Sequence, residues 1–120
     1  MGEVIPELRG RFSGISYRVP VACGSIVDLA LELERPATAS EVNAEFRRAA
    51  SEEMRGIVEY TEEPLVSTDI VGNPHSAIFD ASFTEVVADR SLRVVAWYDN
   101  EWGYASRVVD LLARVGETLR

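Results

Sequence analysis

The first regular pattern along the chain is an alternation of apolar and polar residues in the segment 12–20, FSGISYRVP. A period of two is typical of a strand, because successive side chains of a strand point to opposite faces. One face consists of Ile15, Tyr17 and Val19, and the other of Ser16 and Arg18. Pro20 follows, and proline does not continue a strand ladder. The pattern predicts a strand over residues 12–20.

A second alternating segment, SIVDLALELE at 25–34, predicts another strand. Asp28 and Glu32 lie on its polar face. Its apolar face consists of Val27, Leu29, Leu31 and Leu33. One apolar and one charged face are typical of a strand whose sheet is covered on one side. We therefore expect this strand to be half-buried.

The period changes to that of a helix in RPATASEVNAEFRRAASEEMRG, residues 35–56. Apolar residues fall at helical spacing at Val42, Phe46, Ala49, Ala50 and Met54. Thr38 followed by Glu41 is the pattern of a capping box, and Gly56 is a typical C-terminal stop. The sequence therefore predicts a helix with both ends marked.

The second half of the chain predicts three more strands and a terminal helix. The segment 56–64 is typical of a short strand and 65–76 of a long loop, while 77–99 predicts strands joined around Asp89-Arg90-Ser91. The final helix has Asp99 or Asn100 as its N-cap and an apolar stripe of Val108, Leu111, Leu112 and Val115. Together these elements predict an α+β fold: a mainly antiparallel sheet, one covering helix and a C-terminal helix.

Composition narrows the possible functions. With 120 residues, 47% of them apolar, the chain is long enough for one domain with a buried core. Twenty acidic against twelve basic residues give a formal net charge of −8, which argues against nucleic acid and anionic membranes as partners. The single cysteine, Cys23, permits no intrachain disulfide and suits a reducing compartment. No signal peptide or membrane span is visible, so we expect a cytoplasmic protein.

Four segments together resemble the C-terminal part of phosphorylating glyceraldehyde-3-phosphate dehydrogenase. They are VIPELRGRFSGISYRVP (4–20), SIVDL (25–29), GIVEYTEEPLVSTDIVGNPHSAIFD (56–80) and WYDNEWGYASRVVDL (97–111). The resemblance implies that residues 1–120 are the C-terminal part of the catalytic domain, with 1–99 as sheet plus one helix and 100–120 as the terminal helix. It also implies that the nucleotide-binding domain, the catalytic cysteine and its histidine base precede residue 1.

The resemblance gives three residues a role in the intact enzyme. Arg18, in RVP, corresponds to an arginine that binds the substrate phosphate, and a guanidinium suits a phosphate because it donates in pairs. Asn100, in WYDNE, corresponds to the residue that holds the nicotinamide carboxamide, and an amide both donates to and accepts from such a group. Tyr104, in EWGY, is a weaker cofactor-site candidate, because an aromatic residue in the first turn of a helix usually serves packing.

The other reactive side chains have simpler interpretations. Cys23 has no histidine nearby in sequence, so we do not expect it to be a nucleophile. Val21 and Ala22 depart from the commoner RVPTP form of the family, which puts the geometry of this loop in question. Asp69 and His75 lack the clustered nitrogen and sulfur ligands of a zinc site, so no metal site and no catalytic residue is assigned to this chain.

In the intact enzyme that the resemblance implies, glyceraldehyde 3-phosphate is oxidised with NAD or NADP and phosphate to give 1,3-bisphosphoglycerate. We expect the chain alone to be inactive and not to bind the cofactor tightly, and its partner to be the missing N-terminal part or a homo-oligomer. NAD or NADP, and a related aldehyde such as erythrose 4-phosphate, stay open. The alternative function is a non-catalytic protein-interaction module that keeps the family fold, because the apolar stripe of the last helix needs a partner surface.

Overall fold

The structure is a computed structural model that describes residues 3–119. Residues 1, 2 and 120, the ends of the predicted 1–120 domain, lie outside the described residues. In chain order the elements are a short 3-10 helix, η1 (Pro6–Leu8), β1 (Ser25–Glu32), α1 (Ala39–Ser51), β2 (Val58–Thr61), β3 (Ala77–Val87), β4 (Ser91–Tyr98) and α2 (Trp102–Thr118). The strands and helices predicted after residue 24 are confirmed, although several of them are shorter than predicted.

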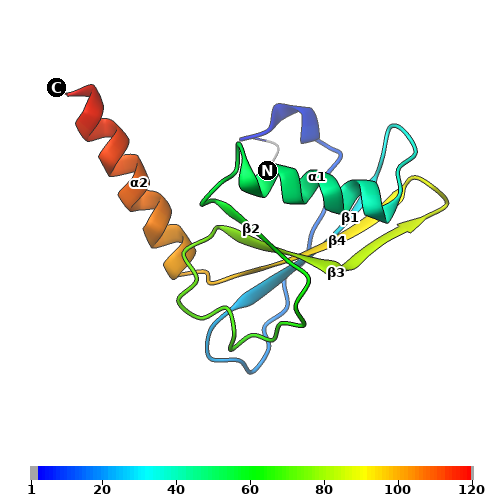
Figure 1. The fold of residues 1–120 in the computed structure, drawn as a ribbon, viewed down its shortest axis with the longest axis horizontal. Coiled ribbons are helices and arrows are strands. Elements are labelled where there is room, and N and C mark those ends of the chain that lie inside the picture. The colour runs from blue at the N-terminus through cyan, green and yellow to red at the C-terminus, as the bar shows by residue number, and fades with distance from the viewer. Residues whose placement is uncertain (1–2, 120) are drawn as a thin grey trace.

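The four strands form one sheet in the order β1-β4-β3-β2 (Figure 1). β4 pairs antiparallel with both β1 and β3, whereas β2 pairs parallel with β3. Parallel neighbours need a crossover connection, which the segment 62–76 provides. The α+β class is confirmed, and the parallel pair makes the sheet mixed.

α1 covers one face of the sheet and forms the main core with it (Figure 1). Phe46 of α1 stacks on Phe79 of β3, with their ring centroids 3.9 Å apart. The buried centre of the cluster consists of Phe79, Ala81, Leu92 and Val94. Burial of these apolar side chains supplies the main driving force for folding. The packing of α1 therefore determines which face of the sheet is shielded from solvent.

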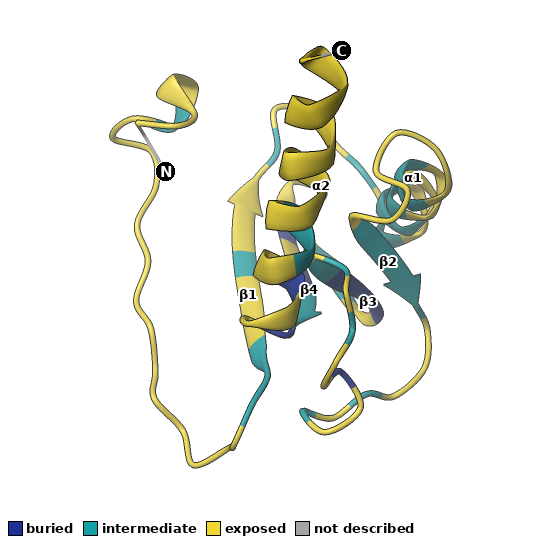
Figure 2. Ribbon diagram, turned by 90° about the vertical axis from the view of Figure 1, so that its left-hand side faces the viewer, coloured by how far each residue is buried: buried dark blue, intermediate teal, exposed yellow. Residues whose placement is uncertain are grey.

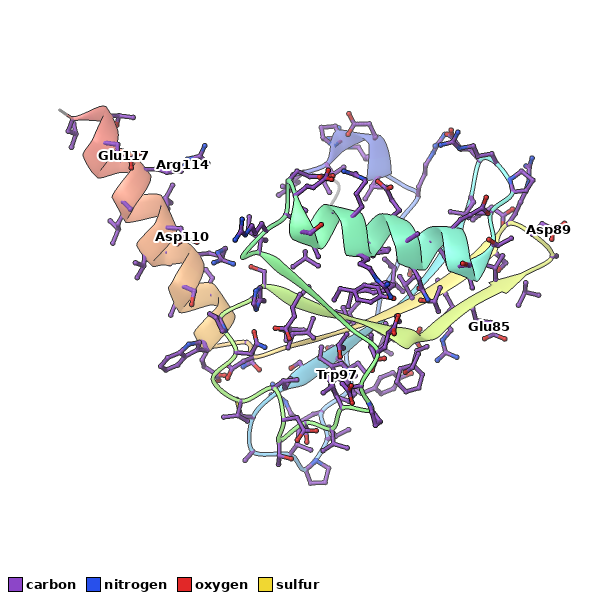
Figure 3. The ribbon with its side chains drawn as sticks, in the orientation of Figure 1. Glu85, Asp89, Trp97, Asp110, Arg114 and Glu117 are labelled. Carbon is purple, nitrogen blue, oxygen red and sulfur yellow. The ribbon has the colours of Figure 1, made fainter. Side chains whose placement is uncertain are left out.

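The opposite face is organised around the carboxylate of Asp80, which is fully buried. One of its oxygens accepts hydrogen bonds from the backbone nitrogen and hydroxyl of Ser82, at 3.1 and 2.6 Å, and the other accepts from Trp97 Nε1 at 3.0 Å. Trp97 lies on this face, away from α1 (Figure 3). The register between β3 and β4 shifts between Asp80 and Glu85. A buried carboxylate needs such partners, so these bonds stabilise the irregular part of β3.

The predicted capping box begins α1. The hydroxyl of Thr38 accepts from the backbone nitrogen of Glu41 at 3.2 Å, and the Glu41 carboxylate accepts from the backbone nitrogen of Thr38 at 2.8 Å. The helix ends at Ser51, earlier than the predicted stop at Gly56. Residues 52–57 form turns, and Gly56 has a φ of +74° just before β2. The glycine therefore turns the chain into the strand and does not end the helix.

The strand predicted over residues 12–20 is absent, and this prediction was wrong. Residues 12–19, which we call the arm, are extended without strand pairing, and Figure 2 shows them standing apart from the sheet. Ile15 is 79% and Tyr17 80% exposed. Alternation fits the pleat of a strand, but a strand forms only where another strand accepts its backbone hydrogen bonds. No strand among residues 3–119 pairs with the arm.

α2 projects from the end of the sheet, and most of its length is exposed (Figures 1 and 2). The predicted apolar stripe is present, but Leu111 and Leu112 are 62% and 65% exposed. Asp110, Arg114 and Glu117 are spaced along the same helix (Figure 3). Its first turns contact the segment before β3: a Cβ on Gly103 would lie 2.9 Å from the His75 carbonyl oxygen, and Arg107 donates to the Ser76 hydroxyl at 3.1 Å.

Among the residues described, the helices are too short or too polar to cross a bilayer.

Replacing Thr38 with Val should lower the free energy of unfolding by about 0.5 to 2 kcal/mol, because the N-terminus of α1 loses a hydrogen-bond acceptor at nearly constant side-chain volume. Chemical denaturation followed by circular dichroism measures the change. Thr118→Val, at the far end of α2, is the matched control and should change stability by less than about 0.5 kcal/mol. Equal effects of the two substitutions would contradict the role of the capping box.

Candidate functional site

Asn100 and Tyr104 lie where β4 ends and α2 begins, and Asp99 holds this junction together. Its side chain is 4% exposed. Oδ1 accepts from the backbone nitrogens of Trp102 and Glu101, at 2.8 and 3.1 Å, and Oδ2 accepts from the backbone nitrogen of Gly72 at 2.9 Å. The N-cap of α2 is Glu101, so the prediction of Asp99 or Asn100 as N-cap was wrong by one or two residues. The Asp99 carboxylate nevertheless accepts from two backbone donors at the start of the helix. It also ties the crossover segment 62–76 to the helix.

These backbone donors shift the acidity of Asp99. The hydrogen bonds from Trp102 and Gly72 lower the pKa of its carboxyl group below the ordinary value, against the effect of burial. A carboxylate at the N-terminus of a helix is also favoured by the helix dipole. Asp99 is therefore a fixed negative charge at neutral pH.

Asn100 lies next to this anchor and is exposed. Its side-chain oxygen accepts from the hydroxyl of Ser25, the first residue of β1, at 3.3 Å. Within residues 3–119 its side-chain nitrogen donates no hydrogen bond. The backbone is held on both sides of Asn100 by Asp99 and α2, so the amide is presented on a rigid turn.

The other two predicted site residues are more exposed. Tyr104 is 74% exposed in the first turn of α2. Arg18 lies on the arm and is exposed as well. Within residues 3–119 no hydrogen bond or ion pair joins Arg18 to Asn100 or Tyr104. In the described chain, Arg18 therefore lies on the arm, whereas Asn100 and Tyr104 lie at the start of α2, and the three residues do not line one closed pocket.

The loop between the arm and β1 is fastened to the junction. Cys23 Sγ donates to Glu101 Oε2 at 3.5 Å. Gly24 has a φ of +90°, and a Cβ there would lie 3.0 Å from Ile70 Cδ1. Left-handed backbone and this close approach both favour glycine. The loop that follows Arg18 is therefore held in one position.

Cys23 has the environment of an unreactive thiol. Partial burial raises its pKa, and the hydrogen bond to Glu101 and the nearby Asp99 and Glu101 carboxylates raise it further. Cys23, Asp99 and Glu101 place a sulfur and two carboxylate oxygens within 4.8 Å of one another. Asp99 already accepts three backbone hydrogen bonds, so this grouping is explained by helix capping and gives no reason to assign a metal.

Asp69 and His75, which the sequence does not favour as metal ligands, have structural partners. Asp69 Oδ2 accepts from the backbone nitrogen of Val66 at 2.8 Å. His75 Nδ1 lies 2.8 Å from Asn73 Oδ1 and 3.0 Å from Glu59 Oε2. These contacts fold the crossover segment against β2. A surface hollow of about 910 Å³ between α1 and β2 includes His75 but neither Arg18 nor Asn100.

Comparison with known proteins agrees with the resemblance in the sequence. Residues 1–100 match the family described as glyceraldehyde 3-phosphate dehydrogenase, C-terminal domain. A glyceraldehyde-3-phosphate dehydrogenase of Mycobacterium avium is 49% identical over 119 residues, which cover 99% of this chain and 35% of that relative. Glyceraldehyde-3-phosphate dehydrogenase 2 of Bacillus subtilis is 50% identical over 117 residues, covering 98% of this chain and 34% of that relative.

The chain belongs to the glyceraldehyde-3-phosphate dehydrogenase family. It spans about a third of the length of the curated relatives that it matches, including a Streptomyces avermitilis protein with 51% identity. The family resemblance is therefore confirmed. The roles of Arg18, Asn100 and Tyr104 stay predictions.

The sequence did not predict two contacts near Asn100: the hydrogen bond from Ser25 to Asn100 and the packing of Gly24 against Ile70. The pattern indicates Ser25 only as the start of a strand, and it does not indicate that Gly24 is fastened against Ile70. The one available signal is the lone glycine between a turn and a strand, which often marks close backbone approach.

Replacing Asp99 with Asn should destabilise the chain by about 2 to 3 kcal/mol at pH 7, because one amide cannot accept all three backbone hydrogen bonds. Since the folded-state pKa of Asp99 is lowered, its stabilisation is present above the unfolded pKa and is lost as pH falls through the folded value. The difference between the two proteins should therefore shrink in acid. Denaturation at several pH values measures it, with Asp110→Asn on the exposed side of α2 as control.

Cys23 should react with iodoacetamide more slowly at pH 7.5 than a free cysteine, because its raised pKa reduces the thiolate fraction. Glu101→Gln removes a carboxylate beside the sulfur and should speed the reaction, while Glu117→Gln, far along α2, should not. Alkylation timed by intact-mass measurement gives the rates. A fast reaction that ignores Glu101 would contradict the assigned environment.

Proposed function

We propose that this chain is the C-terminal part of the catalytic domain of a phosphorylating glyceraldehyde-3-phosphate dehydrogenase. The observation that carries the proposal is the match of residues 1–100 to that domain of the family, together with about half of the residues being identical in relatives along nearly the whole chain. In the intact enzyme, glyceraldehyde 3-phosphate would be oxidised with NAD or NADP and phosphate. The nucleophile and base would come from the remaining part of the polypeptide.

In this proposal Asn100 orients the nicotinamide. Its side-chain nitrogen makes no hydrogen bond within the described chain, and its oxygen makes a long one to Ser25. An amide of this kind can donate to the oxygen of a carboxamide while accepting from its nitrogen. Asp99 and α2 hold the turn in place, and such rigidity is what a residue that orients a cofactor needs.

Arg18 binds the substrate phosphate in this proposal. It belongs to the polar face of the arm, and its guanidinium can donate two hydrogen bonds to one phosphate. The loop that follows the arm is held by the contacts of Cys23 with Glu101 and of Gly24 with Ile70, so the C-terminal end of the arm has a defined position. Tyr104, exposed in the first turn of α2, would lie near the nicotinamide as a lesser contact.

The exposed apolar face of α2 favours a second candidate, a protein-interaction module. Val109, Leu111 and Leu112 are each more than half exposed. In the enzyme this face would pack against the rest of the polypeptide, whereas in a module it would bind another protein. A glycolytic enzyme would act in the cytoplasm, so the cytoplasmic location is part of the first proposal.

A chimera tests the enzyme proposal. In it, this chain replaces the matching third of the Mycobacterium avium relative. It should reduce NAD in the presence of glyceraldehyde 3-phosphate and phosphate. Arg18→Leu in the chimera should raise the KM for the aldehyde phosphate by about tenfold or more, since a charged hydrogen-bonded pair contributes about 1.5 to 3 kcal/mol, and should leave the Kd for NAD unchanged.

Arg35→Leu, in the loop after β1, is the matched control and should alter neither constant. A chimera that folds and binds NAD but gives no turnover would contradict the enzyme proposal and support the module. Equal losses of aldehyde and NAD affinity from Arg18→Leu would contradict the phosphate role alone.

A further inference from the structure

Residues 72–76 of the crossover segment, which we call the seat, lie against the start of α2 (Figure 1). Three contacts join the seat to the helix: the Gly72 nitrogen donates to Asp99 Oδ2 at 2.9 Å, Arg107 donates to the Ser76 hydroxyl at 3.1 Å, and a Cβ on Gly103 would lie 2.9 Å from the His75 carbonyl oxygen. Asn100 lies in the turn just before this helix. The position of the seat therefore determines where Asn100 is presented.

The seat is in turn held to β2 by three half-buried side chains, Glu59, Asn73 and His75. Asn73 Nδ2 donates to Glu59 Oε2 at 2.8 Å, and Asn73 Oδ1 accepts from the backbone nitrogen of His75 at 3.0 Å. His75 Nδ1 lies 2.8 Å from Asn73 Oδ1 and 3.0 Å from Glu59 Oε2. Each of the three side chains therefore contacts the other two, and all of these contacts lie within the chain.

This geometry determines which ring nitrogen of His75 carries a proton. The amide of Asn73 has one suitable orientation, because its oxygen faces a backbone N–H and its nitrogen faces a carboxylate. His75 Nδ1 therefore lies between two oxygen acceptors, and an unprotonated nitrogen there would be repelled by both. Nδ1 is consequently the donor in the neutral ring as well as in the imidazolium, and Nε2 is the atom that gains or loses a proton.

We propose that His75 is a positioning residue for Asn100: as an Nδ1–H donor it holds the seat in place, and the seat fixes the start of α2. This inference rests on the proposed function, in which Asn100 orients the nicotinamide. His75 itself touches neither cofactor nor substrate. It acts through its carbonyl oxygen against Gly103 and through the neighbouring bond from Gly72 to Asp99. Rigid support of this kind matters because a small misplacement of the reacting groups lowers the rate of reaction.

NMR of the ring nitrogens tests the position of the proton without an enzyme assay. His75 is the single histidine of the sequence, so its signals are unambiguous in a chain purified without a histidine tag. At alkaline pH, where the ring is neutral, long-range nitrogen–proton correlation should show Nδ1 protonated and Nε2 unprotonated. The opposite tautomer would overturn the proposal, because Nδ1 would then not donate to Asn73 and Glu59.

Hydrogen exchange tests the link from His75 to α2. His75→Leu removes the donor and should speed exchange of the Gly72 and Trp102 amides, which bond to Asp99, by about fivefold or more. His75→Asn keeps an N–H group near the place of Nδ1 and should restore slow exchange. The amide of Val42, bonded within α1, is the internal control and should exchange at the same rate in all three proteins.

The chimera with the Mycobacterium avium relative measures the consequence for catalysis. His75→Leu should lower kcat by about tenfold and raise the Kd for NAD by about threefold, because Asn100 no longer holds the nicotinamide in one orientation. The KM for the aldehyde phosphate should stay unchanged, since Arg18 lies on the arm. His75→Asn should recover most of the lost kcat. Thr38→Val, which destabilises the fold far from the seat, is the matched control and should leave kcat unchanged.

The possible results separate this inference from the proposed function. An active chimera whose kcat is the same with His75→Leu would contradict the positioning role. Exchange that speeds equally at Val42 and at Trp102 would also overturn it, because His75 would then contribute only to global stability. A chimera without turnover would contradict the proposed function, and the tautomer and the exchange rates would still decide whether His75 holds the seat.

Discussion

The carboxylate of Asp99 is the group on which the functional end of the molecule depends. Through its three backbone hydrogen bonds it joins the end of β4, the start of α2 and the crossover segment at Gly72. A buried anion is stable only when donors replace its lost hydration, and in this junction the donors are backbone groups that otherwise lack partners. One side chain thereby sets the direction of α2 and the position of Asn100. On the face of the sheet away from α1, Asp80 plays a comparable part for the irregular part of β3.

Local patterns predicted local structure well. The capping box at Thr38 and Glu41 and the alternation in β1 depend on residues close in sequence, so they were visible without the fold. The prediction of a strand over residues 12–20 was wrong because alternation shows that a segment could have one apolar face, but does not show that another strand is available to pair with it. The predicted end of α1 was wrong because Gly56 forms a left-handed turn before β2 and does not end the helix. From the sequence alone, a glycine that ends a helix cannot be told from a glycine in such a turn.

The candidate site was predictable mainly through family resemblance. Alone, Asn100 is a turn residue and Arg18 an exposed charge, and neither pattern indicates a ligand. The sequence could not predict the contacts that hold the site in place. The hydrogen bond between Ser25 and Asn100 joins residues 75 positions apart, and the one from Gly72 to Asp99 joins residues 27 positions apart. Contacts at such separations follow from the strand order, which no single segment encodes.

The strand order has a consequence for how the chain is made. β4 lies between β1 and β3, yet it is the last strand in sequence, and its pairing with β1 joins Ser25 to Tyr98. Translation delivers β1 before β4, so β1 lacks this hydrogen-bond partner until residue 98 has been synthesised. Long-range pairing of this kind slows folding and prolongs the exposure of apolar strands to other nascent chains. Among the described strands, an interior strand of the sheet is therefore the last to emerge from the ribosome, and the sheet cannot close until it does.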